Sequence, residues 1–226
     1  LHLPGGEEKP MDIFGDHWEN HFAHIAADWR ARVKDGDVVL IPGDISWAMQ
    51  LERAVPDLQK IGALPGRKVL IKGNHDYWWN TVSKMKRMTD NAFEFIFNSA
   101  LSVENIALAG TRGWIPETSK KITEEDKVII LREQGRLERS LIEAEKFNCE
   151  KIFAILHYPP FDEQRRPTKM MEIMKSHGVT DCIYGHIHGK QNFNNLPKEL
   201  EGIQLHLTSS DYLNFKPLLL TEWNES

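Results

Sequence analysis

Four short apolar runs in this chain each close on a cluster of polar residues. They are GDVVLIPGD (36–44), RKVLIKGNHD (67–76), KIFAILHYPP (151–160) and TDCIYGHIHGK (180–190). Runs of this length and content are typical of strands that are buried on both faces of a sheet. In open α/β sheets, sites form outside the carboxyl ends of the strands. We therefore expect the four polar clusters to converge on one place.

Segments with helical periodicity separate these runs and favour an α/β fold. Helices are predicted over 17–33, 48–61, 79–89, 123–147 and 168–178, and Thr123 with Asp126 predicts a capping box. Further strands are predicted over 93–97, 101–105 and 106–110 as a meander, and over 203–210 and 215–223. The later strands indicate a second sheet, so we expect a two-sheet β-sandwich flanked by helices, in a single domain spanning 1–226.

Composition excludes several classes of function. Hydrophobic residues make up 41% and charged residues 27%, as in soluble globular proteins. A formal net charge of −5 predicts no broad basic surface for nucleic acid or an anionic membrane. No apolar run approaches the roughly 20 residues that a membrane span needs. Cys149 and Cys182 are isolated in the sequence, which favours a reducing, cytoplasmic location.

The polar clusters form an oxygen and nitrogen donor set with no thiolate. Such a set excludes structural zinc of the cysteine type and suits Mn, Fe, Co, Ni or Zn. The candidates are too many for one tetrahedral ion and fit two ions that share a carboxylate. Two neighbouring ions can activate a shared water and hold both the attacking and the leaving oxygen, which suits phosphoryl transfer.

Four of the motifs, in order, resemble those of the calcineurin-like metallophosphoesterase superfamily. They are GDIS (43–46), GNHD (73–76), HYPP (157–160) and GHIHG (185–189). The overall pattern resembles an uncharacterised bacterial branch of predicted phosphohydrolases. The resemblance implies a four-layer α/β/β/α fold. The first motif of the family is Asp-x-His, and His2 matches its histidine, so we expect a strand that ends in aspartate ahead of Leu1.

The resemblance also implies a role for each motif residue. Asp44 would bridge two divalent metal ions. His2 and His188 would complete the first metal site, while Asn74, His157 and His186 would complete the second. His75 would bind no metal and would stabilise the transferring phosphoryl group or protonate the leaving oxygen, with Asp76 orienting and charging its ring.

Aromatic and basic residues near the motifs are candidates for substrate contacts. Trp47, Trp78, Trp79 and Trp114 follow motif loops and suit either a pocket wall or core packing. Arg112 suits either a substrate phosphate or a solvated loop. The same alternatives hold for the pair at 165–166.

The sequence favours a small phosphodiester as the substrate. Protein phosphatases of the superfamily carry Gly-Asp-x-x-Asp-Arg-Gly, whereas this chain reads GDISWAM and lacks that arginine. The expected reaction is hydrolysis by a hydroxide that bridges two metals. Two alternatives stay open: a phosphomonoesterase, including a Ser/Thr protein phosphatase, and a non-catalytic binding scaffold. The intact His75 and Asp76 argue against the scaffold, and a true loss of the first aspartate would argue for it.

Overall fold

The strands form two sheets in the computed structural model, which describes residues 1–6 and 11–222. In the three-stranded sheet, β1 (Val38–Ile41), β2 (Arg67–Leu70) and β3 (Phe93–Phe95) are parallel and adjacent in that order. The six-stranded sheet has the order β4-β5-β6-β7-β9-β8. Its strands are β4 (Leu101–Val103), β5 (Ile106–Thr111), β6 (Lys151–Leu156), β7 (Asp181–Tyr184), β8 (Glu199–Leu200) and β9 (Ile203–Leu207). Only β4 and β8, at its two edges, run antiparallel to their neighbours.

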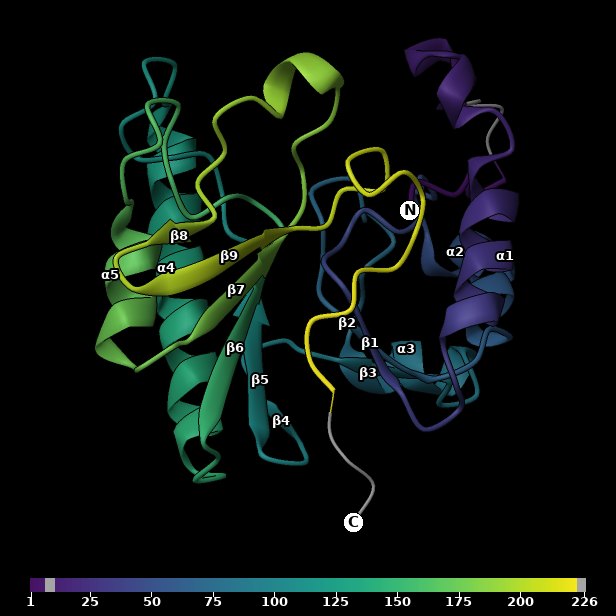
Figure 1. The fold of residues 1–226 in the computed structure, drawn as a ribbon, viewed down its shortest axis with the longest axis horizontal. Coiled ribbons are helices and arrows are strands. Elements are labelled where there is room, and N and C mark those ends of the chain that lie inside the picture. The colour runs from purple at the N-terminus through teal and green to yellow at the C-terminus, as the bar shows by residue number, and fades with distance from the viewer. Residues whose placement is uncertain (7–10, 223–226) are drawn as a thin grey trace.

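Helices cover the outer face of each sheet (Figure 1). The three-stranded sheet packs against α1 (His21–Arg32), α2 (Leu51–Gly62) and α3 (Val82–Met88). The six-stranded sheet packs against α4 (Glu124–Glu145) and α5 (Lys169–Ser176). Short 3₁₀ turns are η1 (Met11–Phe14), η2 (Asp16–Trp18) and η3 (Lys190–Asn192). Among the described residues, no helix is both long and apolar enough to cross a membrane.

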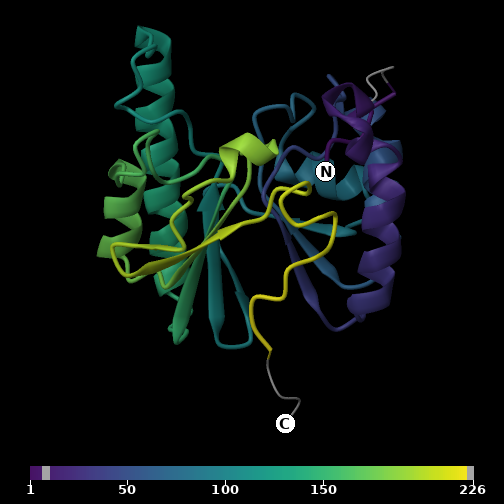
Figure 2. The same ribbon diagram turned by 45° about the horizontal axis from the view of Figure 1, so that its top comes forward.

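Three apolar clusters fill the three interfaces between the four layers (Figure 2). Side chains alternate along each strand, so neighbours enter different clusters. In β2, Val69 faces the other sheet and Leu70 faces the helices. In β6, Phe153 faces the other sheet and Ala154 faces α4 and α5. The predicted helix-flanked sandwich is confirmed, because both faces of these strands are buried.

The capping box at the start of α4 is confirmed. The Thr123 side chain accepts a hydrogen bond from the backbone N–H of Asp126, and the Asp126 carboxylate accepts one from the backbone N–H of Thr123. These bonds satisfy two of the donors that every helix leaves unpaired at its first turn.

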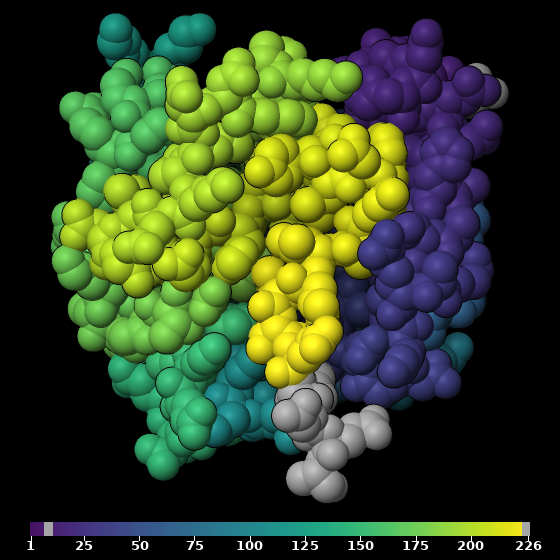
Figure 3. Space-filling model, in the orientation of Figure 1, coloured from purple at the N-terminus to yellow at the C-terminus, as the bar shows by residue number. Residues whose placement is uncertain are grey.

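Two strand predictions are wrong. The expected meander does not form, because β3 pairs with β2 in the three-stranded sheet and only β4 and β5 form a hairpin. Residues 216–222 contain no strand, and Trp223 lies outside the described residues. The segment after β9 instead crosses the junction between the two halves of the molecule (Figure 3), where Phe215 packs against the first core cluster and Leu220 against the cluster between the sheets.

Candidate metal centre

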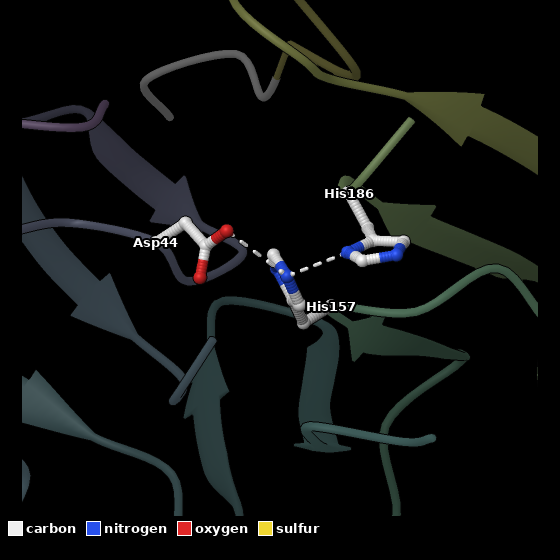
Figure 4. A group of neighbouring side chains, drawn as sticks. All are labelled: Asp44, His157 and His186. Carbon is white, nitrogen blue, oxygen red and sulfur yellow. Dashed lines mark hydrogen bonds and ion pairs between the residues drawn. The ribbon is translucent and has the colours of Figure 1, made fainter. Parts of the chain in front are cut away.

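The predicted ligands follow the carboxyl ends of strands from both sheets. Asp44 follows β1 and Asn74 follows β2, while His157 follows β6 and His186 follows β7. Because parallel strands of both sheets end on the same side of the molecule, these side chains meet above the junction of the sheets. Figure 4 shows Asp44, His157 and His186 pointing toward one another from three different loops.

Four of these side chains form one compact set, which we call the four-ligand group (Asp44, Asn74, His157 and His186). His157 Nε2 lies 2.7 Å from Asn74 Oδ1 and 3.3 Å from Asp44 Oδ2. His186 Nδ1 lies 3.0 Å from the same Asn74 oxygen. One donor atom each from Asp44, His157 and His186 lies within 4.8 Å of the other two. The group offers two oxygens and two nitrogens to a common point.

His2 and His188 form a second set, the histidine pair. Their Nε2 atoms face each other at 3.0 Å. The backbone places His2 beside the first group, because its N–H donates to the Asp44 carbonyl at 2.8 Å and Leu3 forms a parallel bridge with Ser46. The two sets are therefore neighbours joined through Asp44.

Hydrogen bonds on the far side of two rings turn the remaining nitrogen toward the site. His157 Nδ1–H donates to the Pro42 carbonyl at 2.8 Å, which leaves the Nε2 lone pair free. His188 Nδ1 lies 2.8 Å from Asp211 Oδ1, while Asp211 Oδ2 accepts from the Gly189 N–H at 2.8 Å. Carboxylates and carbonyls behind a histidine fix its orientation in this way at metal sites.

Asp211 was not among the predicted site residues. It lies four residues after β9, at the same sheet edge as the other clusters. Its position after the predicted strand over 203–210 was the signal that could have found it.

The pKa values of the imidazoles and of the Asp44 carboxylate favour the protonation states that bind cations. Burial, and then the neighbouring His157, lower the pKa of His186 to about 3. Burial also lowers the pKa of His2 well below its usual value. Burial opposes ionisation of Asp44, but the neighbouring His157 outweighs it and lowers the pKa of Asp44. Neutral rings and an ionised carboxylate are the forms that bind metal.

This donor set fits divalent transition metals. Two pairs of imidazole nitrogens face each other, at 3.3 Å in the four-ligand group and at 3.0 Å in the histidine pair. Imidazole nitrogens this close together can bind one cation jointly through their lone pairs. Imidazole with carboxylate and amide oxygen suits Mn, Fe, Co, Ni or Zn.

A family model described as calcineurin-like phosphoesterase matches residues 5–190, a span that holds the whole four-ligand group and His188. The chain belongs to the calcineurin-like phosphoesterase family. It is therefore a hydrolase of phosphoesters that depends on metal ions. A solved structure of a protein of unknown function from Aquifex aeolicus is 15% identical, with a TM-score of 0.50 over 96% of this chain and 90% of that chain. This likeness shows the fold alone, and no curated protein matches the chain.

Asp76 has a different role from the predicted one. Its carboxylate is 0% exposed and accepts hydrogen bonds from four backbone N–H groups and one indole. The donors are Gly73 (2.7 Å), Asp44 (2.8 Å), Ile45 (2.8 Å), Ser46 (3.3 Å) and Trp78 Nε1 (3.0 Å). Burial, followed by the charge of Asp44, raises the pKa of Asp76. Asp76 fastens the loop after β1 to the loop after β2, and among the described residues no hydrogen bond joins its carboxylate to the His75 ring.

The His75 ring stands beside the ligands without joining them. Its backbone N–H donates to Asp44 Oδ1 at 2.9 Å, which fixes the start of the side chain. The ring packs against Trp47 with centroids 4.3 Å apart, and its buried Nδ1 has no hydrogen-bond partner among the described residues. Trp47 therefore takes over the positioning of the ring that we expected from Asp76.

The remaining substrate candidates divide between core and surface. Trp78 is 1% exposed and Trp79 packs on the core, so core packing is the correct interpretation for both. Trp114 lines a hollow with Tyr158, whose ring lies 4.1 Å from that of His186. The Arg112 guanidinium lies 4.3 Å from the Trp114 ring centre and pairs with Glu133 at 3.4 Å. No contact joins it to the four-ligand group within the described part of the chain.

Two glycines let the loops after β1 and β2 touch. A Cβ on Gly73 would lie 2.2 Å from both the backbone nitrogen and Oδ1 of Asp44, and one on Gly43 would lie 2.5 Å from the Gly73 backbone. Asp44 itself has φ 53°, a conformation that costs a non-glycine residue about 1–3 kcal/mol. The close approach of the loops holds Asp44 in this conformation.

We expect Gly73→Ala to destabilise the fold by about 1–3 kcal/mol and to weaken metal binding, because the loops must separate to admit the methyl group. Urea unfolding and metal content by mass spectrometry measure the two effects. Gly36→Ala is the matched control, since a Cβ there meets nothing within 4 Å. Equal behaviour of the two variants would show that loop contact does not position Asp44.

Proposed function

We propose that this calcineurin-like phosphoesterase hydrolyses phosphodiesters with two divalent transition metal ions and with His75 as the acid. The arrangement that carries the proposal is the division of the donors into the four-ligand group and the histidine pair, with Asp44 between them. One ion would be held by each set, and Asp44 would contact both. Bound Mn, Fe, Zn, Co or Ni would supply an activated water and neutralise charge on the phosphoryl oxygens.

The chain's own residues perform the remaining steps. The backbone N–H of His75 holds Asp44 Oδ1 at 2.9 Å, so the acid and the shared carboxylate keep a fixed relation. When water displaces the ester oxygen from phosphorus, the His75 ring gives a proton to that leaving oxygen. General acid catalysis of this kind contributes about 10²–10⁴-fold. Trp47 excludes water from one face of the ring and keeps it directed at the leaving group.

Preference for a diester rests on charge. A dianionic monoester needs an arginine clamp, and the Asp-Arg-Gly sequence that supplies one is missing after Asp44. Arg112, the candidate substitute, pairs with Glu133 instead. A monoanionic diester needs less positive charge.

We expect kcat/KM for bis-p-nitrophenyl phosphate to exceed that for p-nitrophenyl phosphate by about tenfold, the effect of one charge-assisted clamp. Steady-state rates are measured with each candidate metal in turn, and Mn²⁺ is the expected best activator. An Asp44→Asn preparation measures contaminating phosphatase. A monoester preference under every metal would move the protein to the phosphomonoesterase class, which includes protein phosphatases.

A cytoplasmic location and one domain over 1–226 belong to the proposal. Cys149 and Cys182 are both free thiols, as a reducing compartment requires.

A further inference from the structure

A second group of charged residues lies beside the metal centre and takes no part in it. Strand β5, helix α4 and the loops after β2 and β3 together line an open surface hollow. We call it the basic pocket; its polar lining is Lys72, Thr111, Arg112, Glu133 and Arg136. The phenyl ring of Phe97 forms a wall, 4.9 Å from the Arg136 guanidinium.

Positive charge in the basic pocket exceeds negative charge. Its lining has three cationic side chains and one carboxylate, which leaves two positive charges unbalanced. Lys72 is half-buried and has no hydrogen bond or ion pair with any described residue. Arg112 has a single ion pair at 3.4 Å, and its buried Nε has no partner. A partly buried cation without a partner is costly, so the unpaired Lys72 and the excess of positive charge favour an anion in this pocket.

Glu133 acts as a support for the arginines. Its side chain is 1% exposed, and its Oε2 accepts from the Thr111 hydroxyl at 2.6 Å. Its Oε1 accepts from Arg136 at 2.6 Å. Both carboxylate oxygens of Glu133 therefore have partners within the protein. These contacts hold the guanidinium groups of Arg112 and Arg136 in position to bind a ligand.

We propose that the basic pocket binds a phosphate dianion. Two unbalanced charges match a dianion, and guanidinium groups match phosphate oxygens in geometry. The pocket adjoins the metal centre through the backbone. Lys72 precedes the loop that carries Asn74, and the Arg112 carbonyl accepts the N–H groups of His157 (3.1 Å) and Tyr158 (2.9 Å). The phosphate is either a second phosphate group on the substrate or free inorganic phosphate.

Inorganic phosphate is the probe, and titration calorimetry on the metal-loaded full chain measures its binding. We expect saturable binding that Lys72→Met and Arg136→Gln each weaken by about tenfold or more. Arg139→Gln is the matched control, since Arg139 lies one turn further along α4, is exposed and donates a hydrogen bond to Asn98 at 3.4 Å. Circular dichroism and thermal unfolding check that each variant folds.

Asp44→Asn separates this pocket from the metal centre. Binding that persists in Asp44→Asn and is lost in the two pocket variants supports the proposal, even if the proposed phosphodiesterase activity fails. The proposal is overturned if phosphate does not bind, if binding is insensitive to Lys72→Met and Arg136→Gln, or if Asp44→Asn alone removes it.

A matched pair of substrates identifies the source of the phosphate. Thymidine 5′-(p-nitrophenyl phosphate) is compared with the same compound that also carries a 3′-phosphate. A kcat/KM advantage for the second compound that both pocket variants reduce to unity assigns the pocket to a substrate phosphate. Phosphate binding without such an advantage assigns it to free phosphate.

Discussion

Asp44→Asn is expected to abolish phosphoester hydrolysis and to lower the metal content of the protein. Asp44 is 5% exposed, its carboxylate belongs to the four-ligand group, and its backbone carbonyl accepts the N–H of His2. Loss of its charge weakens the site for every cation it contacts, so activity should fall by at least about 10²-fold. Metal content by mass spectrometry and kcat with bis-p-nitrophenyl phosphate measure both effects.

His75→Ala should behave differently, which makes it the sharpest comparison. It should reduce kcat by about 10²–10⁴-fold and leave the metal content intact, because its ring packs most closely on Trp47 and lies only edge-on to His2, with centroids 6.4 Å apart. His206→Ala is the control. The His206 ring lies 2.8 Å from the Asp181 carboxylate and belongs to neither ligand set. Equal metal loss in Asp44→Asn and His75→Ala would show that the division of roles is wrong.

Asp76→Ala should produce the second large effect, on stability. Five donors lose their acceptor inside the protein, and an unpaired buried donor costs about 1–3 kcal/mol. Part of that cost is relieved by rearrangement, so we expect a loss of roughly 3–5 kcal/mol in the free energy of unfolding. Metal binding should fall as well, because the loop that carries Asp44 is no longer fastened to the loop that carries Asn74.

Asp162→Ala is a matched control for that experiment. Asp162 is also buried, and its Oδ1 accepts the backbone N–H groups of Gln164 and Arg166, each at 2.9 Å. It should cost stability without loss of metal. If Asp76→Ala instead unfolds at the wild-type urea concentration and lowers only kcat, Asp76 supports His75 after all.

The order of strands and ligands could be predicted because it depends on neighbours in the sequence. A short apolar run must be buried, and the polar residues that close it must reach its exposed carboxyl end. This rule predicted the positions of Asp44, Asn74 and His157. The cap at Thr123 could be predicted as well, because its contacts join residues three apart in the sequence. The match to a calcineurin-like phosphoesterase family over 5–190 depends on the same motifs.

Hydrogen bonds between residues that are distant in the sequence could not be predicted from the motifs. Asp76 lies beside His75 in the chain, which suggested a contact between their side chains. In the fold its carboxylate meets N–H groups from a loop about thirty residues earlier, at 2.8 Å from Asp44. Asp211 similarly reaches His188 from a different strand end.

By itself, the sequence determined the kinds of donor, their order, and their places at the ends of buried strands. It did so because burial and backbone pairing force an apolar run to end where polar residues begin. Tertiary structure alone decided which sheet β3 joins, the non-strand path of 216–222, and the separation of Arg112 from the ligands. Those outcomes depend on pairings between distant segments, whose free energies differ too little for local sequence to choose between them.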